Sequence, residues 1–117
     1  MKEENIVKEK SYKFARRIIK LYKFLCEEKK EFILSKQLLR CGTSIGANIF
    51  ESQYGQTRSD FASKLTISLK EAGEAEFWLM LLSDEEFITP TQGESMLTDC
   101  RELIRILQSI TKTLYNR

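Results

Sequence analysis

The sequence predicts an all-α fold, an up-down-up-down four-helix bundle formed by a single domain over residues 1–117. The first observation is that one proline and five glycines are too few turn residues for an all-β chain of this length. The second is that apolar residues recur with helical spacing in four segments that are joined by short polar connections. The hydrophobic content of 42% and the charged content of 31% are typical of a folded globular domain.

The first helix is expected to run from about Asn5 to Lys30. Its apolar residues repeat at i, i+4, i+7 and i+11, the spacing of a stripe that faces a core: Phe14, Ile18, Leu21 and Leu25. The second helix is expected to begin with Ser35 as its N-cap and to end near Tyr54, because Gly55 supplies a stop signal.

The third helix is expected to start after an N-cap at Thr57 or Ser59, and it keeps apolar or small residues at heptad spacing up to Leu82. The fourth start is marked by Thr89 and Pro90, because proline is tolerated at the first helical position. Thr91 with Glu94 offers an alternative capping box. An apolar stripe then continues to the C-terminal end of the chain.

The segment from Arg40 to Glu51 is the most unusual part of the chain, because it combines helical periodicity with mainly small residues. Gly42 and Gly46 lie about one turn apart, and each glycine costs roughly 0.5–1 kcal/mol relative to alanine inside a helix. We expect close backbone approach to a neighbouring helix to offset this cost.

Composition excludes several classes of function. The chain contains no histidine, which removes Ser-His-Asp and Cys-His nucleophile systems and the Glu-x-x-His pairs of di-iron bundles. No phosphate-binding loop is present, and no cofactor is expected. The three cysteines form no CxxC pair and are interpreted as buried, reduced thiols. Without a secretory signal or an apolar run long enough to span a bilayer, a cytoplasmic protein that does not enter a membrane is expected.

Charge is unevenly distributed along the chain. Residues 1–30 carry a balance of +5 and residues 31–117 a balance of −3. Opposite the apolar stripe of the first helix lies a basic face, which consists of Lys13, Arg16, Arg17, Lys20 and Lys23. This face is either a solvated helix surface or a surface that contacts the phosphates of RNA or DNA. Repetition of the face in an oligomer would strengthen its long-range attraction for a polyanion.

A set of polar residues on the second and third helices is the other candidate site. Helical spacing places Arg40, Ser44 and Glu51 on one face with Asn48 beside them, and it places Glu71 and Glu74 on one face of the third helix. Arg40 is expected to pair with a glutamate of the third helix or of another subunit. A network that fixes helix register or subunit packing is favoured. The alternatives are a ligand site and a carboxylate-only Mg²⁺ or Mn²⁺ site at Glu51, Glu71 and Glu74.

The same residues carry a family resemblance. Gln37, Arg40, Ser44, Ile45, Asn48, Ile49 and Glu51 match a pattern of roughly Gln-x-x-Arg-x-x-x-Ser-Ile-x-x-Asn-Ile-Ala-Glu-Gly. This pattern resembles the signature of the four-helix-bundle proteins encoded in intervening sequences of bacterial 23S ribosomal RNA genes. Residues 61–79 resemble the third-helix block of that family, and the likeness extends over about residues 10–113. Phe50 and Ser52 depart from the pattern, which has alanine and glycine there.

The resemblance implies a small cytoplasmic bacterial protein that assembles into a ring, a homopentamer, and it assigns no catalytic role to the polar residues. Related accessory proteins of diversity-generating retroelements bind nucleic acid and a reverse transcriptase. The sequence therefore favours a non-enzymatic, homo-oligomeric accessory protein that uses the basic face of its first helix to bind RNA or DNA. The alternative is a structural or protein-partner module without nucleic-acid binding.

Overall fold

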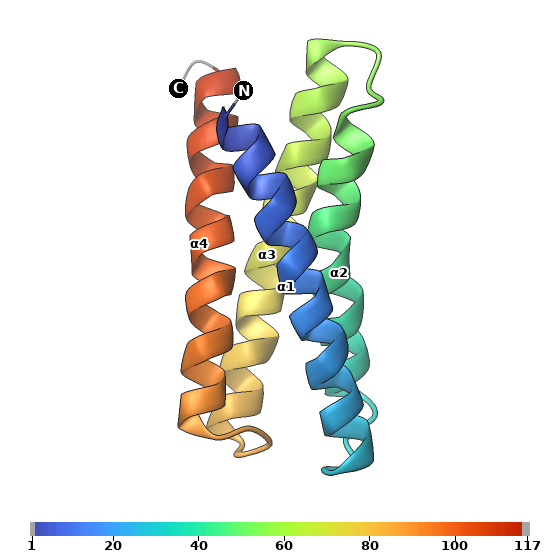
Figure 1. Cartoon of the computed structure of the whole chain (residues 1–117), viewed down its shortest axis with the longest axis vertical. Coiled ribbons are helices and arrows are strands. Elements are labelled where there is room, and N and C mark those ends of the chain that lie inside the picture. Colours follow the sequence, from blue (N-terminus) through green and yellow to red (C-terminus); the bar gives the residue numbers. More distant parts are fainter. Residues whose placement is uncertain (1, 116–117) are drawn as a thin grey trace.

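The computed structural model describes residues 2–115 and contains four helices in the expected order. They are α1 (Lys2–Glu27), α2 (Leu34–Ser52), α3 (Arg58–Asp84) and α4 (Pro90–Leu114). Each helix runs antiparallel to the one before it, and the bundle is elongated, at 44 × 22 × 19 Å (Figure 1). The all-α, four-helix prediction is confirmed. None of the helices in the described residues is long and apolar enough to cross a membrane.

The core is built from the apolar stripes that the helical spacing predicted. Phe14, Ile18 and Leu25 of α1 are almost fully buried against apolar residues of the other three helices. α2 packs between α1 and α3, whereas α1 and α4 share the least extensive contact of the adjacent pairs. Figure 1 shows the reason, since α1 crosses the bundle obliquely and diverges from α4 toward its C-terminal end.

The two glycines of the small-residue segment lie where α2 meets α1. A Cβ atom at Gly42 would lie within 2.8–3.0 Å of three side-chain atoms of Ile18, and one at Gly46 would lie 3.3 Å from the backbone oxygen of Ser11. α2 therefore approaches α1 more closely than an alanine at residue 42 would permit. α1 is therefore the neighbouring helix whose close approach the two glycines predicted.

Helix ends differ from the predictions at α1 and α2. α1 ends at Glu27 rather than Lys30, because Lys30 takes a left-handed conformation (φ 54°) and the Glu31 N–H donates to the carbonyl of Leu25 at 3.0 Å. Ser35 is not the N-cap of α2. Instead, the Glu31 carboxylate accepts hydrogen bonds from the backbone N–H groups of Ile33, Leu34 and Ser35 at 2.6–3.2 Å. α2 ends at Ser52 rather than Tyr54, and a tighter i to i+3 turn continues to Gly55.

The starts of α3 and α4 agree more closely with the sequence. Thr57 is the N-cap of α3 and accepts from the Asp60 N–H at 3.0 Å. Thr89 is the N-cap of α4, with Pro90 at the first helical position. The capping box of α4 is formed by Thr89 and Gln92, not by Thr91 and Glu94, because Thr91 already lies inside the helix.

Candidate functional site

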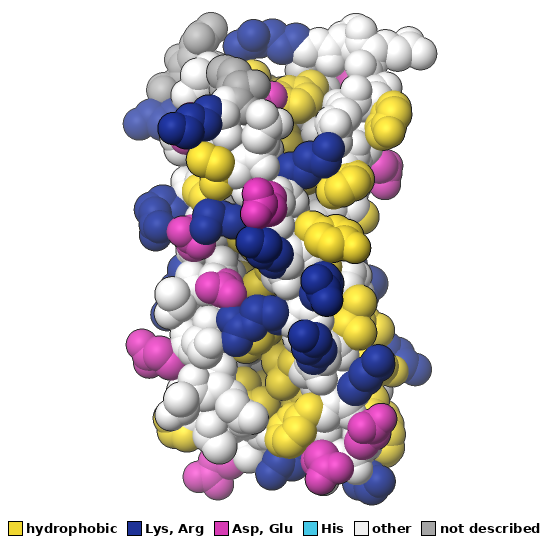
Figure 2. Space-filling view, viewed as in Figure 1, with side chains coloured by type: hydrophobic (Ala, Val, Ile, Leu, Met, Phe, Trp, Pro, Cys, Tyr) yellow, Lys and Arg dark blue, Asp and Glu magenta, His cyan; other side chains and the backbone are white. Residues whose placement is uncertain are grey.

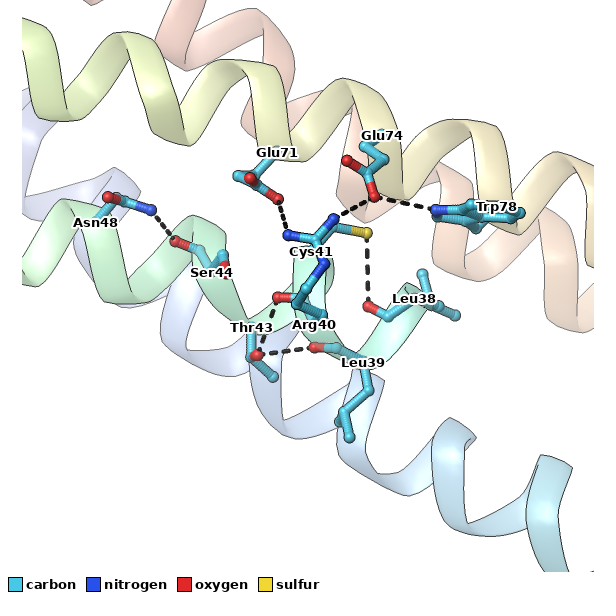
Figure 3. A network of polar contacts seen from close by, with 10 residues as sticks. All are labelled: Leu38, Leu39, Arg40, Cys41, Thr43, Ser44, Asn48, Glu71, Glu74 and Trp78. Carbon is cyan, nitrogen blue, oxygen red and sulfur yellow. Dashed lines mark hydrogen bonds and ion pairs between the residues drawn. The ribbon is translucent and has the colours of Figure 1, made fainter. Parts of the chain in front are cut away.

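Arg40 is the centre of the polar network between α2 and α3 (Figure 3). One guanidinium nitrogen lies 3.3 Å from Glu71 Oε2, and the other lies 2.5 Å from Glu74 Oε2. The indole N–H of Trp78 donates to the same Glu74 oxygen at 3.2 Å. The predicted partner of Arg40 is thus on the third helix of the same subunit. Arg40 bridges two glutamates instead of pairing with both oxygens of one carboxylate.

Electrostatics hold this network in its charged form. The hydrogen bonds from Trp78 and Arg40 lower the pKa of Glu74, and the hydrogen bond to Glu74 raises the pKa of Arg40. Arg40 and Glu74 therefore do not exchange protons near neutral pH, as a general acid or base must. The Arg40 side chain is 52% exposed, so the ion pairs contribute only about 0–1 kcal/mol to the stability of the subunit.

The remaining residues of the predicted set make separate contacts. The amide of Asn48 donates to the backbone carbonyl of Ser44 at 2.8 Å, a bond within α2. Glu51 pairs with Lys64 of α3 at 3.0 Å, so it is not joined to Arg40. Glu71 and Glu74 thus share Arg40 whereas Glu51 contacts Lys64, and among residues 2–115 no group of three or more potential ligands is placed to hold a metal ion. That the set fixes register or packing stays a prediction.

The basic face of α1 divides into paired and unpaired cations. Arg17 forms a 2.6 Å ion pair with Asp99 of α4, and Lys13 pairs with Glu9 one turn away at 3.0 Å. Within the described part of the chain no carboxylate pairs with Arg16, Lys20 or Lys23, and all three are exposed. In Figure 2, Lys and Arg side chains follow α1 down the middle of the visible face.

The cysteines are free, and two of them are buried. Burial raises the pKa of the Cys41 thiol and of the Cys100 thiol to about 12, so both stay protonated at neutral pH and neither is a nucleophile. Cys26 is only half-buried, which corrects the expectation of three buried thiols.

An exposed apolar surface joins α1 and α2, and we call it the α1–α2 patch. It is a hollow of about 300 Å³ lined by Tyr12, Ala15, Thr43, Gly46, Ala47 and Phe50. The Tyr12 and Phe50 rings lie 6.4 Å apart, and the ammonium of Lys8 lies 4.8 Å from the centre of the Phe50 ring. Apolar side chains are visible beside the cations of α1 in Figure 2. The sequence singled out Phe50 but not Tyr12, which lies at the margin of the α1 stripe.

The aromatic pair on α3 has two different environments. Trp78 is half-buried and packs against the core, whereas Phe77 is 56% exposed and contacts Trp78 edge-to-face, with ring centres 5.1 Å apart. Large aromatic side chains on a bundle helix are expected from the sequence to be core or interface anchors. Phe77 is not a core residue of the subunit, and an interface role for it remains a prediction.

The comparisons with known proteins place the chain in a family. The family model of the 23S rRNA-intervening sequence proteins matches residues 3–109. A crystal structure of a protein of unknown function from the S23 ribosomal protein family of Bacteroides thetaiotaomicron VPI-5482 is similar, with 55% identity and a TM-score of 0.92. The match covers 94% of this chain and 98% of that one. None of the curated proteins matches the chain. The chain therefore belongs to the family of 23S rRNA-intervening sequence proteins.

Proposed function

We propose that this chain is a non-enzymatic, cytoplasmic accessory protein that assembles into a homo-oligomeric ring and binds the phosphates of RNA or DNA through the basic face of α1. A pentamer is the ring size that the family resemblance favours. The observation that carries nucleic-acid binding is the set of exposed cations at Arg16, Lys20 and Lys23, for which no carboxylate partner lies in residues 2–115.

The spacing of these cations suits a nucleic-acid strand. From residue 16 to residue 23 the helix rises about 10 Å, which equals the rise of about three phosphates along one strand of a duplex. A ring repeats this set once per subunit, so weak contacts add along a long polyanion. Arg17 is held by Asp99 and is expected to contribute least, because its charge is already paired.

Salt-dependent binding to a structured RNA and to a DNA duplex tests the proposal. Replacing Arg16, Lys20 and Lys23 by glutamate should weaken binding and reduce the slope of log affinity against log salt by about 1 per cation removed. The matched control replaces Arg58, Arg105 and Lys112 by glutamate, which changes net charge equally at exposed cations that also lack carboxylate partners among the described residues. Equal loss in both variants, or no loss in the first, refutes the assignment of the face.

A protein-partner module without nucleic-acid binding is the second candidate. It is favoured by Asp84, Glu85 and Glu86, which are exposed at the end of α3 and have no cation partner within the described residues. In that case neither nucleic acid binds at any salt concentration, while added salt weakens the oligomer by screening contacts between this acidic end and a basic neighbour.

A further inference from the structure

The outer surface of α3 is unlike a solvated helix face. Among the described helices, α3 alone lacks a clear separation of apolar and polar sides. On the side away from the core, residues at alternating spacings of four and three form what we call the α3 strip: Thr66, Lys70, Gly73, Phe77, Met80 and Asp84. Phe77 is 56% exposed and Met80 45% exposed. Large apolar side chains that lie exposed beside each other can mark a surface that a partner covers, and heptad spacing suits a contact with a further helix.

Gly73 is the second observation on this strip. A Cβ atom there would meet no atom of residues 2–115 within 4 Å, in contrast to the close contacts of Gly42 and Gly46 with α1. The described part of the subunit therefore offers no packing reason for a glycine in the middle of α3, where it costs roughly 0.5–1 kcal/mol relative to alanine. Close approach of a helix from outside the subunit would supply one.

The α1–α2 patch is the complementary surface on the same chain. It offers an apolar hollow beside small residues of α2, while the strip offers exposed apolar side chains, Phe77 and Met80. The strip lies toward α4, because the Thr66 hydroxyl reaches the Tyr115 hydroxyl at 3.4 Å. The two surfaces therefore lie on different sides of the bundle, and both can be occupied at once.

Charge complementarity favours a second copy of the chain as the occupant. The strip ends at Asp84, which is followed by the acidic residues Glu85 and Glu86. Exposed Lys36 lies two turns before Thr43 on the side of α2 that carries the patch. The end of α3 and the start of α2 lie at the same end of the bundle (Figure 1). In a ring of parallel subunits, residues at the same level along the bundle axis of neighbouring subunits lie side by side. The acidic end of one strip is therefore expected to lie beside Lys36 of the next subunit.

We propose that the α3 strip of one subunit docks into the α1–α2 patch of the next, so that the ring is held by one head-to-tail contact between two different faces. A contact of this kind closes into a ring when its rotation divides a full turn. The inference rests on the self-assembly part of the proposed function and adds the surfaces that carry it. The cations proposed for nucleic-acid binding, Arg16, Lys20 and Lys23, belong to neither surface.

Two variants block the two faces separately. Gly73→Glu places a charged side chain on the strip at a position that is open in the subunit, and Ala47→Glu does the same on the exposed side of the patch. Light scattering should report the mass of one subunit, 13.7 kDa, for each variant. Thr98→Glu, at an exposed residue of α4, is the matched control and should keep the mass of the wild-type assembly. Circular dichroism verifies that each variant is folded.

Mixing the two variants provides the decisive readout. Each retains one intact face, so an equimolar mixture should form a complex of twice the subunit mass and no larger species, because the remaining faces are both blocked. A wild-type chain that is monomeric overturns self-assembly and this inference together. A wild-type oligomer whose mass survives both variants overturns only the assignment of the faces. Larger species in the mixture would show that a further contact holds the assembly.

Discussion

Gly42→Ala should destabilise the subunit although it improves helix propensity. Alanine would gain roughly 1 kcal/mol over glycine in a free helix interior. Against this, the added Cβ would lie 2.8, 2.9 and 3.0 Å from Ile18 Cγ1, Cδ1 and Cγ2. Because all three atoms belong to a fully buried side chain, rotation of its tip cannot relieve the overlap. Overpacking of this kind costs about 1–3 kcal/mol, so we expect a net loss of roughly 0–2 kcal/mol.

Urea denaturation followed by circular dichroism measures this loss, at one low subunit concentration so that assembly contributes equally to every variant. Gly46→Ala is the internal comparison, since its nearest atom is the Ser11 oxygen at 3.3 Å and only a shift of a few tenths of an ångström is needed. It should be close to neutral. The reasoning is refuted if Gly42→Ala stabilises the subunit by the full helix-propensity gain of roughly 1 kcal/mol.

A double-mutant cycle with Ile18→Ala locates the cause. Ile18→Ala alone opens a cavity and should cost about 2–5 kcal/mol. In the Gly42→Ala background the same change also removes the overlap, so its cost should fall by about 1 kcal/mol or more. Additive effects would show that the Gly42 penalty arises elsewhere than at Ile18.

Three further predictions concern the cap, the thiols and the network. Glu31→Ala should cost about 0.5–2 kcal/mol in a urea titration, because three N–H groups of α2 lose their acceptor. Burial favours the neutral acid, but the bonds from Ser35, Leu34 and Ile33 outweigh it and lower the folded pKa of Glu31. The contribution of Glu31 to the free energy of unfolding is thus complete above the unfolded pKa of about 4.3 and is lost as the pH falls through the folded pKa. Glu31→Ala should remove this part of the pH dependence of stability. An aromatic disulfide reagent should modify Cys26 first and leave Cys41 and Cys100 unmodified until the chain unfolds. Arg40→Met should lower stability by less than about 1 kcal/mol, because the ion pairs that it removes are exposed.

Local signals in the sequence predicted the fold well, because each helix contains its own periodic stripe and most of its own boundaries. Thr57, Thr89 and Pro90 act on neighbours within four residues, so their roles could be read directly. The cap of α2 could not be identified in the same way. Ser35 and Glu31 both offer oxygen acceptors near the helix start, and only the left-handed turn at Lys30 brings the Glu31 carboxylate onto the N–H groups.

The site was harder to predict because it depends on contacts between helices. Helical spacing placed Arg40 opposite Glu71 and Glu74 correctly, since these residues lie at the same height of the α2–α3 contact. The register at the far end of that contact was not determined by spacing, and there Glu51 pairs with Lys64. The α1–α2 patch was missed for a similar reason, because Tyr12 and Phe50 are far apart in sequence and meet only when α1 crosses α2.

The magnitudes of these contacts indicate what fixes the α1–α2–α3 arrangement. The Arg40 ion pairs are half-exposed and contribute about 0–1 kcal/mol. The close contact of Gly42 with Ile18 involves fully buried atoms and tolerates no added methyl group without a cost of about 1–3 kcal/mol. Packing at the glycines therefore restricts the position of α2 more strongly than the polar network does. Because α2 is held against α1 in this way, Ala47 and Phe50 keep a fixed position beside Tyr12, which is the condition for the α1–α2 patch to act as a docking surface.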